Sequence, residues 1–139
     1  MMIRSYHPND ETTVIALWER CGLTRPWNDP RKDIARKLDV ARELFLVGVL
    51  DGEIVASAMG GYDGHRGWVN YLAVAPEVRR RGLGARLMAE LERLLRERGC
   101  AKLNVQIRAA NADATGFYRA LGFSIDDVVS MGKRLERDD

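Results

Sequence analysis

Arginine and glycine stand together in one short run of this chain, between a strand pattern and a helix pattern. The run comprises Arg79, Arg80, Arg81, Gly82 and Gly84. Glycine lets the backbone approach a ligand closely, and arginine adds permanent positive charge. The first turn of a helix presents N–H groups without intrahelical partners and the positive end of the helix dipole. The combination predicts a cradle for a phosphate group.

Two common nucleotide-binding motifs do not describe this run. No Gly-Lys-Ser/Thr follows the glycines, as a Walker loop requires, and Gly82-x-Gly84 has no third glycine at the offset of a dinucleotide fingerprint. Taken alone, the run also fits a solvated row of arginines beside an ordinary helix start.

The composition is that of an ordinary globular domain. The chain has 139 residues, 46% of them hydrophobic and 30% charged, which favours a single domain over residues 1–139 with a substantial core. The net charge of +2 is too small to favour a nucleic-acid partner. Between Ala75 and Ala109, however, nine lysines and arginines stand against four glutamates, so we expect a local anionic ligand.

Cysteine usage and the N-terminal residues favour a reducing compartment. Cys21 and Cys100 form no disulfide framework and are expected to be free thiols. The N-terminal residues lack an apolar signal core, and no run reaches membrane-spanning length. We therefore expect a cytoplasmic protein without a membrane partner. We expect no metal site, because His7 and His65 have no partner at ligand spacing.

Hydrophobic periodicity and turn residues predict the elements that position the arginine and glycine run. In order, they are a strand over 2–6, a helix closed by Gly22, a helix from Pro30 to about Ala41, strands over 44–50, 54–59 and 68–75, a long helix closed by Gly99, a strand over 103–107, a helix over 111–121, and strands over 123–125 and 128–135. Asp51-Gly52 predicts a tight hairpin, and the stretch 60–67 a second turn.

This order, β-α-α-β-β-β-α-β-α-β-β, predicts an α+β (α/β) fold. We expect a mixed, mostly antiparallel central sheet of about seven strands with helices on both faces. The strand over 103–107 returns after a helix, so it should lie parallel to the strand over 68–75 in a right-handed βαβ unit.

Two motifs in this framework resemble the GNAT (Gcn5-related N-acetyltransferase) superfamily. Arg79-x-x-Gly82-x-Gly84, after Leu72-Ala-Val-Ala-Pro76, is similar to the family's acetyl-CoA-binding motif. Asn111-Ala-Asp-Ala-Thr-Gly-Phe-Tyr118 is similar to its downstream helix. The resemblance spans nearly the whole chain. The stretches 17–21, 25–30 and 60–67 look like the small bacterial YpeA-type branch.

The resemblance implies acetyl-CoA as co-substrate and assigns residues to it. In GNAT proteins the backbone of the fourth strand pairs with the pantetheine arm, and an N–H from it can polarise the thioester carbonyl. The turn, the helix start and the arginines hold the phosphates, and an asparagine contacts the cofactor. The residues so implied are Leu72, Ala73, Val74, Arg79, Arg80, Arg81, Gly82, Leu83, Gly84, Ala85 and Asn111.

Tyr118 matches the family's general acid, which protonates the leaving thiolate. A phenol suits that role because it is a neutral donor at pH 7. By pattern alone, Tyr118 is also compatible with a core aromatic of a short helix. Asn111 is also a good helix cap, and its two uses can coexist.

Gln106 departs from the family pattern. The ribosomal-protein and N-terminal alanine acetyltransferases of the superfamily carry a glutamate base there, and an amide cannot accept a proton at neutral pH. Deprotonating a lysine amine at pH 7.4 costs about 4 kcal/mol, whereas an α-amine costs under about 1 kcal/mol. We therefore expect water-mediated deprotonation, with Asp63, His65 and Glu77 the nearest titratable side chains in sequence.

The acceptor is expected to meet the loops, which carry function in such folds. The candidate acceptor-binding residues are Arg25, Trp27, Asn28, Asp63 and Gln106. Trp27 fits a buried loop anchor equally well. Asp29 and Asp63 would suit a cationic acceptor. Arg25 and Arg66 would suit an acceptor with a carboxylate, and the sequence leaves both open.

These interpretations predict an acetyl-CoA-dependent N-acetyltransferase. It would move an acetyl group to a primary amine of a small molecule, peptide or protein by direct attack on the thioester, as a monomer or a homodimer. A non-catalytic acyl-CoA-binding or sensing module with the same fold is the first alternative. A nucleic-acid binder is disfavoured, because no aromatic residues interleave with the arginines.

Overall fold

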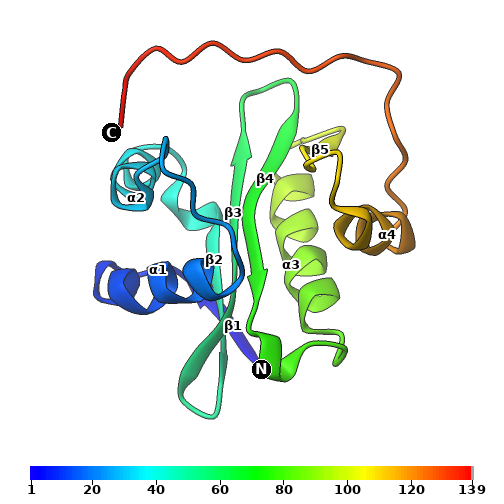
Figure 1. The fold of residues 1–139 in the computed structure, drawn as a ribbon. Helices are drawn as coiled ribbons and strands as arrows, with labels where there is room; N and C mark the ends of the chain where they lie inside the picture. Colours follow the sequence, from blue (N-terminus) through cyan, green and yellow to red (C-terminus); the bar gives the residue numbers. More distant parts are fainter. Residues whose placement is uncertain (139) are drawn as a thin grey trace. The chain divides into compact units, whose positions relative to one another are not determined.

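The computed structural model describes residues 1–138, which divide into two compact units. The first unit comprises residues 1–105 and Asp138, and the second comprises residues 106–137. Figure 1 labels the helices and strands of both. The single domain expected from the chain length stays a prediction.

The first unit holds one sheet and three α-helices. Its elements are β1 (Met2–Ser5), α1 (Glu11–Arg20), α2 (Pro30–Leu38), β2 (Phe45–Leu50), β3 (Glu53–Tyr62), β4 (Gly67–Val74), α3 (Leu83–Glu97) and β5 (Leu103–Val105). The strands lie in the order β1-β2-β3-β4-β5. The first four are antiparallel neighbours and β5 is parallel to β4, which confirms the mixed sheet and the parallel return after α3.

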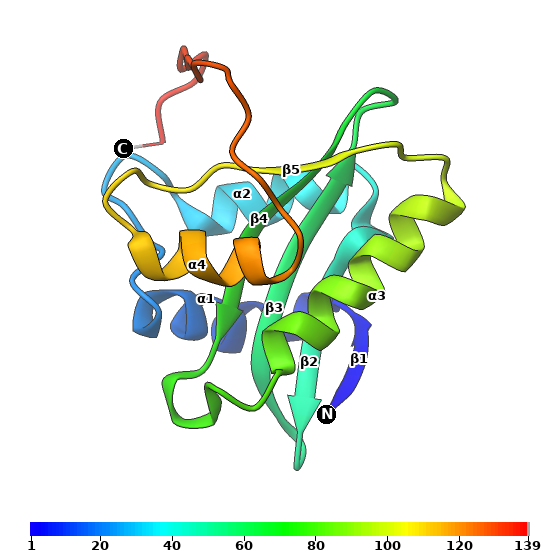
Figure 2. The same ribbon diagram turned by 90° about the vertical axis from the view of Figure 1, so that its right-hand side faces the viewer.

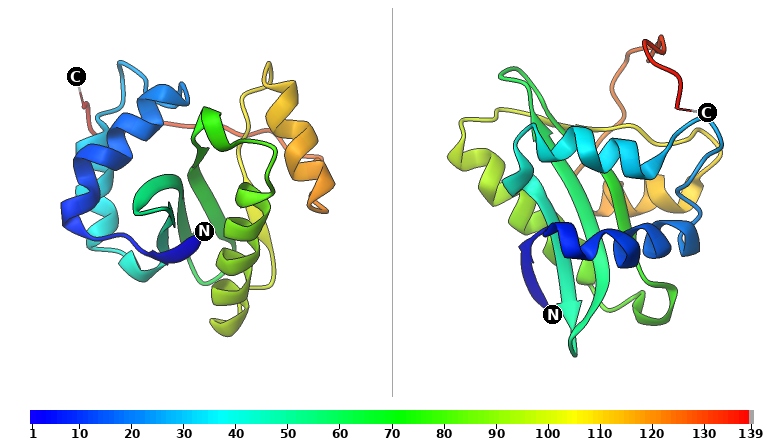
Figure 3. Two further views of the ribbon diagram at one scale, coloured as in Figure 1. Left: turned by 90° about the horizontal axis from the view of Figure 1, so that it is seen from below. Right: turned by 90° about the vertical axis from the view of Figure 1, so that its left-hand side faces the viewer.

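Helices cover both faces of this sheet. In Figures 1 and 3, α1 and α2 lie on one face and α3 on the other, and in Figure 2 α3 runs across the face of the sheet. The alternation of β3 explains the two layers. One side carries Ser57 and Met59, which belong with α1. The other side carries Ala56, Ala58 and Gly60. These residues are small enough for α3 to approach, and a Cβ on Gly60 would overlap Leu91.

A row of stacked aromatic rings forms the centre of the layer beneath α1. The ring centroids of Tyr6 and Phe45 lie 4.3 Å apart, and those of Trp18 and Tyr71 lie 3.8 Å apart with the rings 12° from parallel. Trp18 Nε1 donates to Ser57 Oγ at 2.9 Å, and Ser57 Oγ donates to the Tyr71 carbonyl at 3.0 Å. The buried indole and hydroxyl are thus both satisfied, which fixes Tyr71 against the core.

β4 contains a bulge at Tyr71. Ser57 of β3 pairs with Ala73, but Met59 pairs with Asn70, so β4 has one residue more than β3 in this interval. Tyr71 has φ +52°, a conformation that is costly for a residue with a side chain. An extra residue of this kind bends a strand and redirects its side chains.

Two local sequence signals are confirmed by the backbone. Asp29 caps α2 by accepting the N–H of Arg31 at 2.9 Å, with Pro30 in the first position of the helix. Asp51 and Gly52 both have positive φ, +52° and +79°, as a tight two-residue hairpin requires.

Two strand boundaries differ from the expectation. β3 continues to Tyr62, which pairs with Gly67, so the turn expected over 60–67 occupies only 63–66. β5 ends at Val105 rather than at residue 107, because its pairing with β4 stops at Val69.

The second unit contains α4 (Ala112–Ala120). The predicted strands over 123–125 and 128–135 are wrong, since residues 121–137 contain no strand. The five-stranded sheet therefore replaces the expected seven strands. Ile125, Val129 and Leu135 are 73%, 88% and 92% exposed. Apolar β-formers become strands only when a neighbouring strand accepts their backbone and covers their side chains, and this segment has neither.

Every helix among residues 1–138 is too short or too polar to traverse a lipid bilayer.

Candidate functional site

The edge of β4 extends beyond its neighbour β5. Pairing between the two strands covers Gly67–Val69 and Leu103–Val105 only. The following stretch of β4, which includes Leu72, Ala73 and Val74, has no strand beside it on that side among residues 1–138. Backbone N–H and C=O groups along this stretch can therefore bind an extended ligand in the manner of an added strand.

The turn after β4 contains two residues in the left-handed backbone conformation. Arg80 and Gly82 have φ +66° and +74°, both in the left-handed region. No atom lies within 4 Å of a Cβ added to Gly82, so the backbone conformation, rather than lack of space, favours glycine there. A positive φ at Arg80 costs about 1–2 kcal/mol, and such strain collects at functional sites.

The first turn of α3 forms the rest of the candidate cradle. Gly82 is the N-cap and provides no side-chain cap, and no acidic residue lies in the first turn. The first intrahelical bond from this turn joins the N–H of Arg86 to the Gly82 carbonyl at 3.1 Å. The N–H groups of Leu83, Gly84 and Ala85 precede it and lie at the positive end of a long helix, where an anion is favoured.

The three arginines of the turn are not equivalent. Arg79 Nε donates to the Val74 carbonyl at 3.0 Å, so this side chain folds back onto the end of β4. All three arginines are exposed to solvent. Arg79 thus also braces the end of the strand, whereas Arg80 and Arg81 extend the predicted positive charge of the turn.

A second cluster gathers around the bulge in β4. The Tyr71 hydroxyl donates to Asp33 Oδ2 at 2.6 Å and also hydrogen-bonds the Asn28 side chain. Burial, followed by the neighbouring Asp33 carboxylate, raises the pKa of Tyr71 well above its usual value, so the phenol stays neutral. Asn28 was a predicted acceptor-binding residue. Asp33 and Tyr71 were not, although Asp33 follows the cap residue Asp29 by one helical turn.

Arg25 and Trp27, also predicted at this side, have different environments. The Arg25 guanidinium donates to the carbonyls of Gly22 and Thr24 at 2.7 and 2.8 Å, so it holds its own loop together. Trp27 is 50% exposed, which rules out a buried loop anchor, and its role toward the acceptor stays a prediction.

Asp63 stabilises the turn between β3 and β4. Its carboxylate accepts the backbone N–H groups of His65 and Arg66 at 2.8 and 2.7 Å and a bond from the Trp68 side chain. These bonds, led by the Arg66 N–H, lower the pKa of Asp63. The turn adjoins the start of β4, whereas the phosphate cradle follows its end. A role for Asp63 toward the acceptor stays a prediction.

The remaining predicted residues belong to the second unit. Asn111 caps α4 by accepting the N–H of Ala114 at 3.0 Å, so its expected role as a helix cap is confirmed. Tyr118 is 7% exposed, its ring meets Phe123 edge-on, and burial raises its pKa to about 12. Gln106 Nε2 donates to Ser130 Oγ at 2.5 Å. The roles of these three residues in catalysis or binding stay predictions.

Among the residues that the structure describes, no three His, Cys, Asp or Glu side chains gather as a metal site requires.

Comparisons with known proteins show which family the chain is similar to. The family model of the acetyltransferase (GNAT) family matches residues 9–123. An acetyltransferase of Pectobacterium atrosepticum is 49% identical over 138 residues, covering 99% of this chain and 98% of that protein. The crystal structure of Ard1 from Thermoplasma volcanium has a TM-score of 0.81 at 27% identity, over 90% of this chain and 83% of that one. The structure of the ribosomal-protein-S18-alanine N-acetyltransferase from Escherichia coli has a TM-score of 0.73 at 26% identity, over 88% of this chain and 77% of that one.

The matches to named acetyltransferases identify the chain as an acyltransferase. The chain belongs to the GNAT acetyltransferase family.

Proposed function

We propose that this protein transfers the acetyl group of acetyl-CoA to a primary amine by direct attack of the amine on the thioester. The observation that carries the proposal is the stretch of β4 beyond Val69, which leads directly into the cradle at the start of α3. One continuous segment thus offers strand-like hydrogen bonds followed by an anion site, the order in which a pantetheine arm and a pyrophosphate occur in coenzyme A.

The residues of this segment fit the co-substrate. Leu72, Ala73 and Val74 would pair with the amides of the pantetheine arm, and the N–H groups from Arg80 to Ala85 would bind the pyrophosphate. The exposed Arg80 and Arg81 would balance its charge. An N–H of β4 would stabilise the oxyanion that forms on the thioester carbonyl.

The chemistry needs one proton removed and one supplied. The amine nitrogen forms a bond to the acetyl carbon, the C–S bond breaks, and the thiolate takes a proton. Tyr118 is proposed as that donor, and its pKa of about 12 keeps it protonated at neutral pH. The amine loses its proton to water, because the amide of Gln106 cannot act as a base.

Relatives support an amine as the acceptor without fixing which one. The Escherichia coli relative is named for acetylating an alanine of ribosomal protein S18, whereas the Pectobacterium relative is named only as an acetyltransferase. A non-catalytic acyl-CoA sensor is disfavoured for a chain whose relatives are named as enzymes.

The proposal is tested by measuring thiol release from acetyl-CoA across a panel of amines. The panel holds polyamines, amino acids, aminoglycosides, and peptides with free N-termini or internal lysines. We expect release with one class and binding of acetyl-CoA without any acceptor. A protein that binds acetyl-CoA but releases no thiol with any member would contradict amine acetylation as its activity.

A further inference from the structure

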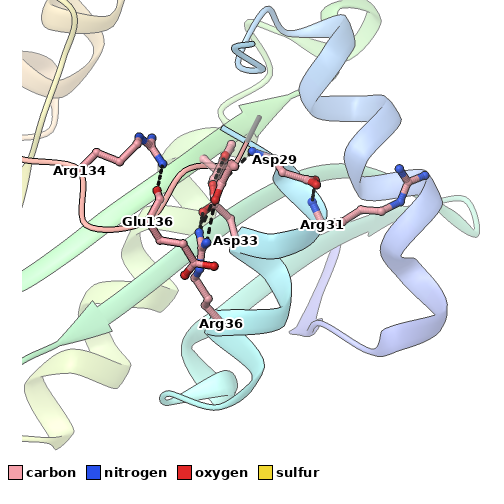
Figure 4. Close-up of polar contacts among 8 residues, drawn as sticks. Asp29, Arg31, Asp33, Arg36, Arg134 and Glu136 are labelled. Atoms are coloured by element: carbon pink, nitrogen blue, oxygen red, sulfur yellow. Dashed lines mark hydrogen bonds and ion pairs between the residues drawn. The ribbon is translucent and has the colours of Figure 1, made fainter. Parts of the chain in front are cut away.

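Two polar side chains and a backbone N–H group gather at one face of α2. Asp33 and Arg36 are three residues apart, which places them on the same side of the helix, and the N–H group belongs to the cap residue Asp29. Figure 4 shows Asp33 and Arg36 together, with the Asp29 carboxylate directed toward Arg31. The Asp29 carboxylate is occupied by capping α2, and Asp33 binds Tyr71 of β4. Arg36 Nη1 lies 3.2 Å from Asp33 Oδ1, so its charge is held beside the β4 bulge.

A carboxylate of the chain itself occupies this face. Arg36 Nη2 donates to Asp138 Oδ1 at 2.7 Å, and Nη1 approaches Oδ2 at 3.4 Å. The backbone N–H of Asp29 donates to Oδ2 at 3.0 Å. Both oxygens are therefore bound, by a guanidinium and by a backbone N–H, and the Asp138 side chain exposes none of its surface.

We call the Arg36 guanidinium and the backbone N–H of Asp29 the carboxylate seat. Their geometry and charge match a carboxylate. A guanidinium presents paired donors that match the two oxygens of a carboxylate, and the Asp29 N–H adds a fixed third donor. Hydrogen bonding to Arg36, followed by the Asp29 N–H, lowers the pKa of Asp138 to about 2. In the second unit, by contrast, Arg134 Nη1 donates to the Glu136 carbonyl, a neutral acceptor two residues away (Figure 4).

Charge alternates along this face from the sheet outward. The neutral hydroxyl of Tyr71 is followed by the Asp33 carboxylate, the Arg36 guanidinium and the bound carboxylate of Asp138. A molecule with an ammonium group and a carboxylate a few ångströms apart complements this series. The two arginines that the sequence offered for a carboxylate donate to carbonyls of their own loops, Arg25 to Gly22 and Thr24 and Arg66 to His65.

We propose that Arg36 and the backbone N–H of Asp29 bind the carboxylate of the acetyl acceptor, and that Asp33 attracts its ammonium group. The acceptor class is then an amino acid or a close analogue. In the absence of acceptor, the Asp138 carboxylate occupies the carboxylate seat, and it competes with the acceptor for these donors. This inference rests on the proposed acetyl transfer to an amine, because it assigns the substrate of that reaction.

The kinetic test compares amino acids with their amides as acceptors. Each pair keeps the amine and differs in the carboxylate. We expect the Arg36→Gln substitution to raise KM for the amino acids about 10–100-fold, the loss of a charged hydrogen bond, and to affect the amides little. Arg36→Lys should recover part of the preference. Arg31→Gln removes an exposed arginine from the same helix and should leave both members of each pair unchanged.

A binding measurement separates this inference from the proposed function. N-acetylalanine is titrated into ¹⁵N-labelled full-length protein while the amide signal of Asp29 is followed. We expect a saturable shift that occurs at lower concentration in the Asp138→Asn variant, because the competing carboxylate is gone. The shift should vanish when Arg36→Gln is added.

The outcomes point in different directions. Thiol release with amines, but no carboxylate preference and no Asp29 shift, overturns the inference and leaves acetyl transfer intact. A saturable Asp29 shift without thiol release from any amine supports the carboxylate seat and overturns the proposed function. If the Asp29 shift occurs at the same N-acetylalanine concentration in wild type and Asp138→Asn, Asp138 does not compete for the carboxylate seat. That result overturns the proposed competition.

Discussion

Two regions bordering β4 are proposed to recognise charge by different means. The turn and helix start over residues 79–85 present backbone N–H groups in a conformation set by glycine. The face of α2 presents side chains, Asp33 and Arg36, whose positions depend on a hydrogen bond to Tyr71. The first region suits an invariant co-substrate, since it uses atoms that every residue has. The second suits a variable acceptor, because single substitutions change its charge.

This division predicts how each region fails. A change of backbone conformation should abolish binding in the first region whatever the side chain, and a change of side chain should alter selectivity in the second without affecting the first.

Gly82→Val should abolish acetyl-CoA binding. Valine at φ +74° is strained although its Cβ meets no atom, so the turn must change shape. Gly52→Val is the matched control, because Gly52 has φ +79° and equally open surroundings in the β2–β3 hairpin. Both variants should lose a similar free energy of unfolding, but titration calorimetry should detect lost acetyl-CoA affinity only for Gly82→Val. Retained affinity would break the assignment of the backbone cradle.

Tyr118→Phe should lower kcat about 10²–10⁴-fold, because it removes the proposed proton donor, and leave acetyl-CoA affinity nearly unchanged. Steady-state kinetics and calorimetry on one preparation check both. Tyr6→Phe serves as control, since burial also raises the pKa of Tyr6 to about 12 and this residue has no proposed role in the reaction. Wild-type turnover in Tyr118→Phe would remove this side chain from the mechanism.

Tyr71→Phe should raise KM for the acceptor several-fold, because Asp33 loses the hydroxyl that positions it, with a stability loss of about 0.5–1.5 kcal/mol. Affinity for acetyl-CoA should not change, and Tyr62→Phe, whose hydroxyl bonds the Gly64 carbonyl, should leave both unchanged. An equal effect on both substrates would show that the two regions are not independent.

Asp10→Asn tests a carboxylate that serves the fold alone. Hydrogen bonds from Arg4 at 2.8 and 3.0 Å, the main cause, lower the pKa of Asp10. Its stabilisation is therefore present above the unfolded-state pKa of about 3.9 and is lost as the pH falls through the lower folded-state value. Urea unfolding at pH 7 should show a loss of about 1–2 kcal/mol, shrinking in acid, with KM for both substrates unchanged. A constant difference between pH 7 and pH 2 would contradict this assignment.

The sequence predicted the backbone region better than the side-chain region for a physical reason. The signals used there are local, namely Gly82, the apolar pattern of β4 and Gly99 at the end of α3, and each element formed where its own residues favoured it. Asp33 and Arg36 were missed because their candidate roles follow from tertiary contacts. α2 lies beside a bulge in β4, and Arg36 binds a carboxylate 102 residues away. No local pattern encodes either.

The strand prediction for the segment after α4 was wrong for a related reason. The β-formers around Val128 and Val129 have the composition of a strand, but strand formation depends on a neighbouring edge that the segment itself cannot supply. Predictions from a short window therefore held for helices and hairpins, which close their own hydrogen bonds, and were wrong where pairing was required.

The stack of Trp18 on Tyr71 gives the protein an optical reporter of its own. Trp18 is fully buried, whereas Trp27 is 50% exposed and Trp68 is partly exposed. With Trp27 and Trp68 replaced by phenylalanine, the fluorescence of a single indole would come from a ring 3.8 Å from the tyrosine that holds Asp33. A molecule that disturbs this tyrosine would change the emission of Trp18. Acceptor candidates can therefore be screened by tryptophan fluorescence before any reaction is observed.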